Sequence, residues 1–133
     1  MKPLLSLSFL EPKKPNQYWQ DEQFIGQDQI SREIDEVGKE GVKAAYLIGS
    51  LVELKGKDYY KRKPGDMDIY LWGEDYMPLD VINHLKSRIE ALEINDLPVH
   101  VIDRPYHPFE TYEKDFLDIQ KVHPLYVNRI RLL

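Results

Sequence analysis

The chain has 133 residues, no cysteine and a formal net charge of −5, with 42% hydrophobic and 31% charged residues. This length suits one domain with a single core, so we expect residues 1–133 to form one domain. The lack of cysteine excludes disulfides and thiolate metal sites and favours a cytoplasmic location. No apolar run can span a bilayer, so we expect no membrane contact. A mildly acidic chain is also not a general nucleic-acid binder, although a local basic patch still could be.

The N-terminal 27 residues are predicted to form a strand and an arm. Residues 4–10 alternate apolar and polar side chains, which is typical of a strand, and Pro12 ends it. Residues 15–29 are polar with three aromatic side chains, and we expect an irregular arm with at most one helical turn. Trp19 has two interpretations: a ring that stacks on a nucleobase, or part of a lid that packs on the core.

Two amphipathic helices are predicted in the core segment, residues 28–103. In the first, over 28–39, the apolar side chains follow the helical period; Asp28 is the expected N-terminal cap, and Gly38 or Gly41 the end. In the second, over 78–93, Pro78 suits the first turn. The stripe that it is expected to bury comprises Leu79, Ile82, Leu85, Ile89 and Leu92.

Three strands are predicted beside these helices. Residues 42–48 are an almost continuous apolar run, typical of a strand covered on both faces, and residues 67–72 and 97–103 form the other two. Residues 104–133 are expected to hold a weaker helix over 109–120 and a tail over 125–133, either a last strand or a docking segment. The fold class predicted is therefore α+β, with a small mixed β-sheet backed by helices.

The central stretch carries the residues that point to chemistry. Gly49 and Ser50 follow the strand over 42–48, and small residues in a turn let backbone N–H groups cradle a phosphate. Asp66 and Asp68 lie two residues apart at the start of the next strand, so their carboxylates project from one face about 6–7 Å apart. Paired carboxylates repel each other unless a cation lies between them, and hard oxygen ligands suit Mg²⁺.

This pattern resembles the signature of the polymerase-beta-like nucleotidyltransferase superfamily, closest to its small, single-domain minimal nucleotidyltransferases. The match covers roughly residues 30–103. The resemblance implies that Asp66 and Asp68 are catalytic metal ligands for two Mg²⁺ ions that bridge the triphosphate and the attacking hydroxyl. It also implies that Gly49 and Ser50 bind the β- and γ-phosphates of a nucleoside triphosphate, most simply ATP.

The chain departs from the family pattern at the third carboxylate. In the strand over 97–103, His100 stands where the family places that carboxylate, and Asp103 should face the opposite side of the sheet. Either His100 replaces the carboxylate as a catalytic general base, or the third ligand is lost and the domain binds nucleotide without turning it over. A β-bulge that turns Asp103 into the site is a further alternative.

The loop between the two central strands is longer than in the minimal enzymes and is basic. Residues 55–63 contain five basic side chains, two tyrosines and Asp58, for a local charge of +4. Lys61 and Arg62 are the candidate nucleotide-binding residues in it. The loop suits a triphosphate, an RNA end or an acidic partner surface, and a merely solvated loop is the alternative.

Two classes of function follow. The first is an enzyme that transfers a nucleoside monophosphate from ATP to a hydroxyl of a protein or RNA acceptor and releases pyrophosphate. The second is a binding module with an impaired metal site that acts by contact with a protein, as a subunit or antitoxin. The resemblance implies a helical toxin of the HEPN type as one such partner. Homo- and hetero-oligomers both remain open.

Overall fold

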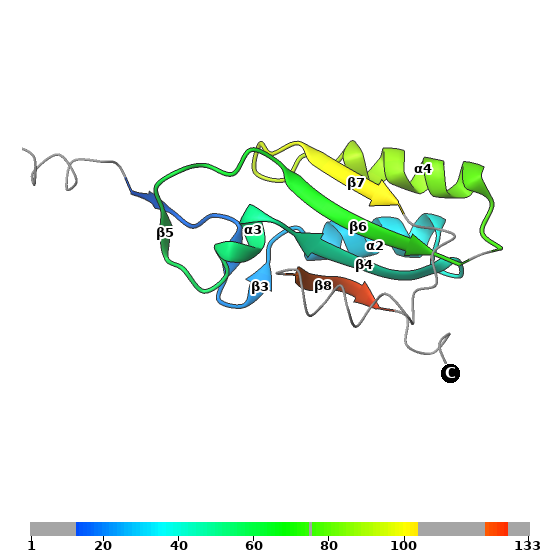
Figure 1. Cartoon of the computed structure of the whole chain (residues 1–133), viewed down its shortest axis with the longest axis horizontal. Helices are drawn as coiled ribbons and strands as arrows, with labels where there is room; N and C mark the ends of the chain where they lie inside the picture. The colour runs from blue at the N-terminus through cyan, green and yellow to red at the C-terminus, as the bar shows by residue number, and fades with distance from the viewer. Residues whose placement is uncertain (1–12, 75, 104–121, 128–133) are drawn as a thin grey trace, which may run out of the picture.

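A four-stranded mixed sheet carries the fold in the computed structural model, which describes residues 13–74, 76–103 and 122–127. The strands are β1 (Lys14–Pro15), β2 (Trp19–Gln20), β3 (Gln23–Phe24), β4 (Val42–Ile48), β5 (Tyr59–Tyr60), β6 (Met67–Gly73), β7 (Val99–Asp103) and β8 (Val122–Val127). The helices are α2 (Gln27–Val37), α3 (Ser50–Glu53) and α4 (Leu79–Glu90) (Figure 1). The strand predicted over 4–10 and the helix predicted over 109–120 lie outside the described residues.

The sheet has the strand order β7-β6-β4-β8, with β4 and β6 in the middle. Strand β4 pairs antiparallel with both β6 and β8, whereas β6 and β7 are parallel. A parallel pair needs a long crossover connection, and α4 supplies it between β6 and β7. The mixed sheet backed by helices that the sequence predicted is therefore present.

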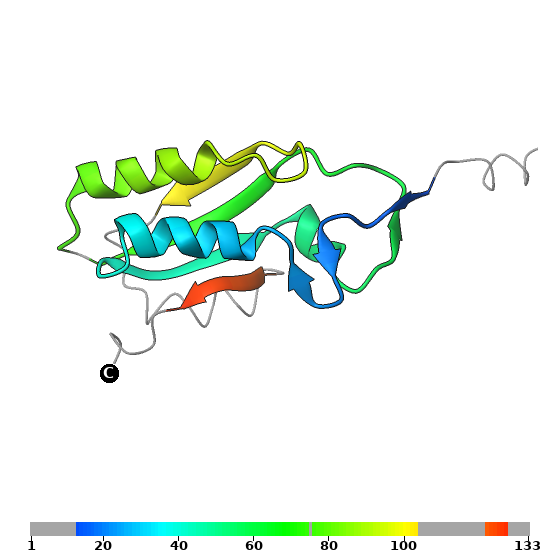
Figure 2. The same cartoon turned by 180° about the vertical axis from the view of Figure 1, so that it is seen from behind.

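Helices α2 and α4 lie side by side on one face of the sheet (Figure 2). The apolar period of each helix turns its buried residues toward that face, where they meet alternate side chains of the strands. Fully buried members of this core include Ile30, Ile34, Ala45, Leu47, Ile69, Leu71, Ile82, Leu85, Ile89 and Val101. This packing holds α2 and α4 against the sheet.

The other face of the sheet carries a smaller aromatic cluster and the polar candidate residues. Tyr46 and Trp72 are buried there and meet edge to face, with ring centroids 6.0 Å apart. Tyr70 stacks on Trp72 at 5.4 Å. Because strand side chains alternate between faces, Asp68 shares this face with Tyr70, opposite the helices.

Both predicted helices are present, but three details of the prediction were wrong. The first helix is capped by the backbone at Gly26 with no side-chain hydrogen bond, and Asp28 lies within the first turn. Pro78 precedes the second helix in an extended conformation, so Leu79 is its first residue. The side chain of Leu79 is 53% exposed and so does not belong to the buried stripe. Gly38 does end the first helix, as its N–H donates to Ile34 O at 2.8 Å.

The N-terminal arm is more ordered than the sequence predicted. Strands β2 and β3 form a tight hairpin whose turn includes Asp21 in a left-handed conformation (φ 57°), and β1 pairs with β5 from the basic loop. The C-terminal strand β8 begins at Val122, earlier than the predicted tail. Across the described ranges, no helix has the length and apolar character needed to cross a membrane.

Candidate active site

The bend at Gly49 ends β4 and begins α3. Gly49 has φ 87° and ψ −152°, a region that only glycine occupies readily. The sequence indicated a turn here, but the short helix α3 that follows it, Ser50–Glu53, was not predicted. Gly49 and Ser50 are both exposed, so their backbone can be approached from solvent. Within the single turn of α3 the N–H of Val52 donates to Gly49 O at 3.1 Å. The N–H groups that precede it at the start of a helix have no partner within the helix and can bind an anion.

The carboxylate of Asp68 lies against this bend. Ile48 and Asp68 are paired across β4 and β6, so the start of β6 is beside the end of β4. A Cβ atom added to Gly49 would lie 3.6 Å from Asp68 Oδ2. The structure thus brings together the glycine bend and one of the two acids.

Asp66 lies next to Asp68 and changes its acid–base behaviour. Burial raises the pKa of Asp68 above its ordinary value, and the negative charge of Asp66 and a hydrogen bond between the two side chains raise it further. The neighbouring His100 lowers the same pKa. Two carboxyl groups are therefore close enough to repel each other when both are ionised. An added cation would relieve that repulsion.

His100 lies beside Asp68 on the neighbouring strand. The two residues are paired in the parallel register of β6 and β7. The imidazole is at the sheet edge, with Nδ1 3.5 Å from Glu90 Oε2, and Glu90 also accepts a hydrogen bond from the N–H of Val101 at 2.9 Å. The His100 side chain is 58% exposed, so an incoming molecule can reach it.

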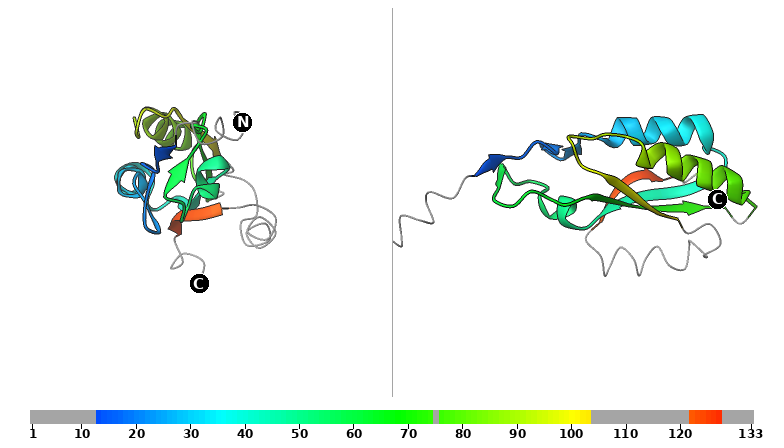
Figure 3. Two further views of the ribbon diagram at one scale, coloured as in Figure 1. Left: turned by 90° about the vertical axis from the view of Figure 1, so that its left-hand side faces the viewer. Right: turned by 90° about the horizontal axis from the view of Figure 1, so that it is seen from above.

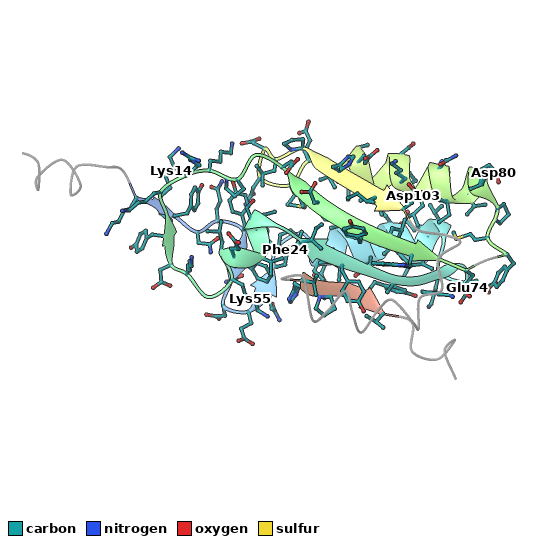
Figure 4. All side chains as sticks on the ribbon, in the orientation of Figure 1. Lys14, Phe24, Lys55, Glu74, Asp80 and Asp103 are labelled. Atoms are coloured by element: carbon teal, nitrogen blue, oxygen red, sulfur yellow. The ribbon has the colours of Figure 1, made fainter. Side chains whose placement is uncertain are left out.

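Asp103 lies on the helix-covered side, as strand alternation predicted. Its Oδ1 is 3.4 Å from Lys86 Nζ of α4, and Figure 4 shows it near that helix. The pairing of β6 with β7 runs without a register shift from Met67 to Leu71. A bulge that turns Asp103 into the site, one of the alternatives, is therefore contradicted.

Asp66 and Asp68 are the candidate ligands for magnesium at this site. Over the described parts of the chain, no group of three or more His, Cys, Asp or Glu side chains is arranged to hold a metal ion. Mg²⁺ is commonly held by one or two carboxylates, with substrate phosphates and water as its other ligands. The carboxylates of Asp66 and Asp68 fit that type of site. They do not fit a closed site in which every ligand comes from the protein.

Lys61 and Arg62 follow β5 and are exposed. Strand β5 pairs with β1, and Figure 1 shows this pair beyond α3, at the end of the sheet that carries Gly49. Lys61 and Arg62 therefore lie in the loop after β5, at the same end of the sheet as Gly49. They belong to a different element from Asp66 and Asp68.

Trp19 and Asn16 support the glycine bend, a role that sequence reasoning did not assign to them. The Trp19 ring is 6% exposed, and its Nε1–H donates to Leu51 O of α3 at 2.7 Å. The packed interpretation of Trp19 is thus correct, and a buried ring cannot stack on a base. The Asn16 side chain donates to Leu54 O and Lys57 O, both at 2.8 Å. No local sequence pattern signals such long-range bonds.

His123 of β8 packs against the same tryptophan. The two rings meet edge to face with centroids 4.8 Å apart. Lys55 Nζ lies 3.5 Å from His123 Nδ1 and 5.8 Å from the centre of the Trp19 ring. Burial, together with the Lys55 charge, lowers the pKa of His123. These contacts join the C-terminal strand to the element that follows the bend.

Comparison with known proteins supports the fold. No family model and no curated protein matches this chain. A mutant of the toxin–antitoxin MntA–HpeT has a similar structure, with a TM-score of 0.50 and 11% identity over 79% of this chain and 75% of the other. A toxin–antitoxin with AMP-PNP gives a TM-score of 0.51 and 15% identity over 80% and 77%.

The fold of the chain is like that of these two toxin–antitoxin structures. At these identities the likeness concerns the fold alone, and the fold class predicted from the sequence is confirmed.

Proposed function

We propose that this protein is a minimal nucleotidyltransferase that transfers a nucleoside monophosphate from ATP to a hydroxyl of a protein or RNA acceptor. The observation that carries the proposal is the approach of the Asp68 carboxylate to the bend at Gly49, with Asp66 beside it. A bend that can bind an anion lies next to two carboxylates that repel each other. This arrangement suits a triphosphate together with its magnesium ion better than it suits a triphosphate alone or a magnesium ion alone. The neighbour with AMP-PNP agrees with such a ligand.

The triphosphate would bind over the bend. Backbone N–H groups after Gly49 and the Ser50 hydroxyl would hold the β- and γ-phosphates, and the missing side chain at Gly49 leaves room for them. Lys61 and Arg62, which are exposed in the loop after β5, would balance the negative charge of the phosphates. Binding in this pose would set the α-phosphorus near Asp68, because that carboxylate lies beside the bend.

Asp66 and Asp68 would hold magnesium, and the rest of its coordination would come from phosphate oxygens and water. When bound, the ion neutralises charge that develops on the transferring phosphate. By holding the ion, the two acids would orient the phosphate. Asp68 must be ionised for this role, and its raised pKa brings its protonation closer to neutral pH.

His100 would act as the general base. It lies on β7 beside Asp68, is accessible, and can receive the proton of the acceptor hydroxyl as the oxygen attacks the α-phosphorus. A new oxygen–phosphorus bond then forms, and the bond to the bridging oxygen breaks. Pyrophosphate leaves with the electron pair of that bond.

A second candidate function is contact with a protein partner. The donor set of the described residues lacks a third metal ligand, which favours a module that binds nucleotide without turnover. The structural neighbours are toxin–antitoxin proteins, so a helical toxin of the HEPN type is the partner that we propose for this case.

The test is magnesium-dependent release of pyrophosphate from each nucleoside triphosphate, measured with and without a hydroxyl acceptor. We expect ATP turnover that Asp66→Asn and Asp68→Asn abolish. Asp103→Asn is the matched control, since it removes a carboxylate from the same sheet on the opposite face. Equal activity in Asp68→Asn and the wild type would refute the proposed site. Tight ATP binding without turnover, unchanged by Asp68→Ala, would support the contact module instead.

A further inference from the structure

The pairing of β1 with β5 builds a basic ribbon at the end of the sheet that carries Gly49. We define the basic ribbon as residues 13–15 and 57–63. Lys14 lies opposite Tyr60 and Pro15 opposite Tyr59, although the two strands are far apart in the sequence. Figures 1 and 3 both show this pair projecting beyond α3. The structure thus adds two N-terminal lysines to the basic loop.

Positive charge is concentrated on the basic ribbon. All of its basic side chains are exposed: Lys13, Lys14, Lys57, Lys61, Arg62 and Lys63. Asp58 is its one acidic residue, so the ribbon has a formal charge of +5, which leaves −10 on the remainder of a chain whose total is −5. Asp21 and Glu22 line a pocket together with Lys57 at the border of the ribbon. The excess of positive charge on the ribbon still attracts a polyanion to this end of the protein.

The ribbon is anchored on one side and open on the other. Tyr60 is 6% exposed and packs on Tyr18, with ring centroids 5.8 Å apart. Tyr59 is 58% exposed, because successive strand side chains point to opposite faces. Asn16, which follows β1, donates its N–H to Asp58 O at 2.7 Å, and its side chain bonds the end of α3. The basic ribbon is therefore fixed to the element that begins at the bend.

We propose that the basic ribbon binds single-stranded nucleic acid and presents its terminal hydroxyl to Asp66 and Asp68. Cations along a ribbon match a phosphate backbone, and the exposed ring of Tyr59 offers a stacking surface for an unpaired base. An acidic protein surface would use the cations but has no base to stack. The ribbon also leads directly to the site, since Lys63 is three residues before Asp66. The presentation of the hydroxyl rests on the proposed function, whereas the binding does not.

The binding is tested by fluorescence anisotropy with short labelled RNA and DNA single strands, using the full chain without magnesium or ATP. Tyr59→Ala should weaken binding about 5- to 150-fold, while Tyr59→Phe keeps the ring and should bind like the wild type. Lys13→Gln with Lys14→Gln should reduce the steepness of log affinity against log salt by about 1.4. The control is Arg32→Gln with Lys39→Gln, which removes two exposed charges outside the ribbon and should change neither quantity.

Several outcomes would overturn the inference. Absence of binding at low salt is one, and equal binding of the control and ribbon variants is another. If polyglutamate binds as tightly as RNA and Tyr59→Ala changes neither affinity, the ribbon is a surface for an acidic protein. With ATP and magnesium, lengthening of the bound strand at its 3′ hydroxyl supports its role as acceptor. Pyrophosphate release without lengthening refutes only the role of the strand as acceptor. Absence of both pyrophosphate release and lengthening refutes the proposed function.

Discussion

Replacing Gly49 by alanine tests the bend on which the candidate site depends. The backbone there has φ 87° and ψ −152°, a region that is essentially restricted to glycine. A Cβ atom would lie 3.6 Å from Asp68 Oδ2, which is an ordinary contact. The cost of Gly49→Ala is therefore backbone strain rather than a clash, about 1–3 kcal/mol of the free energy of unfolding. Relief of that strain would rotate the N–H groups that follow the bend.

The matched control is Gly56→Ala. Gly56 also has a positive φ, 80°, and an added Cβ would have no neighbour within 4 Å. Both variants should lose stability through strain, but only Gly49 adjoins Asp68. Urea unfolding followed by circular dichroism measures the stability. Calorimetry with magnesium and a non-hydrolysable ATP analogue measures the binding.

We expect both variants to be less stable than the wild type and only Gly49→Ala to lose nucleotide affinity. Unchanged stability in Gly49→Ala would contradict the conformation of the bend. Equal losses of affinity in the two variants would show that binding follows overall stability, and the bend would then have no special role.

Three further predictions concern the supports of the site and its charge. Trp19→Phe leaves the carbonyl oxygen of Leu51 without its buried donor, and we expect unfolding by urea to show a loss of about 1–3 kcal/mol. Leu85→Ala should cost about 2–5 kcal/mol in the same assay, and Leu79→Ala, at a half-exposed position, should cost much less; equal costs would contradict the packing of α4. The pKa of Asp68 is raised in the folded protein, so its ionisation destabilises the fold. Between the unperturbed value of 3.8 and the folded-state pKa, the native state binds more protons than the unfolded state. The free energy of unfolding therefore falls as pH rises through this range. Without magnesium, Asp68→Asn should therefore be more stable than the wild type at pH 7, and the difference should vanish below pH 3.8; a constant difference across this range would show that ionisation of Asp68 is not its source.

The core of the fold could be predicted because its elements repeat a simple pattern. The apolar run over 42–48 became β4 with the same bounds, and the apolar stripes located α2 and α4. Alternation along β7 correctly placed Asp103 on the face opposite His100. These features follow from the period of side chains in helices and strands, which a sequence displays directly.

The supports of the site could not be predicted, because they depend on contacts between distant segments. Strands β1 and β5 have two residues each, too few for a periodic pattern, and each exists through its partner. The hydrogen bond from Trp19 to Leu51 joins segments that are 32 positions apart. Helix α3 is a single turn, and its start depends on the conformation of Gly49 rather than on helix propensity.

The position of β8 has a consequence for how the protein is made. This strand is the last of the described elements, yet it pairs with β4, which lies much earlier in the sequence. During synthesis on the ribosome, β4 therefore lacks one neighbour until residues 122–127 have emerged. Such distant pairings form slowly, and an unpaired strand edge in a nascent chain invites aggregation. The segment leading to Gly49 would thus keep one unpaired edge in the newborn chain until β8 has been made.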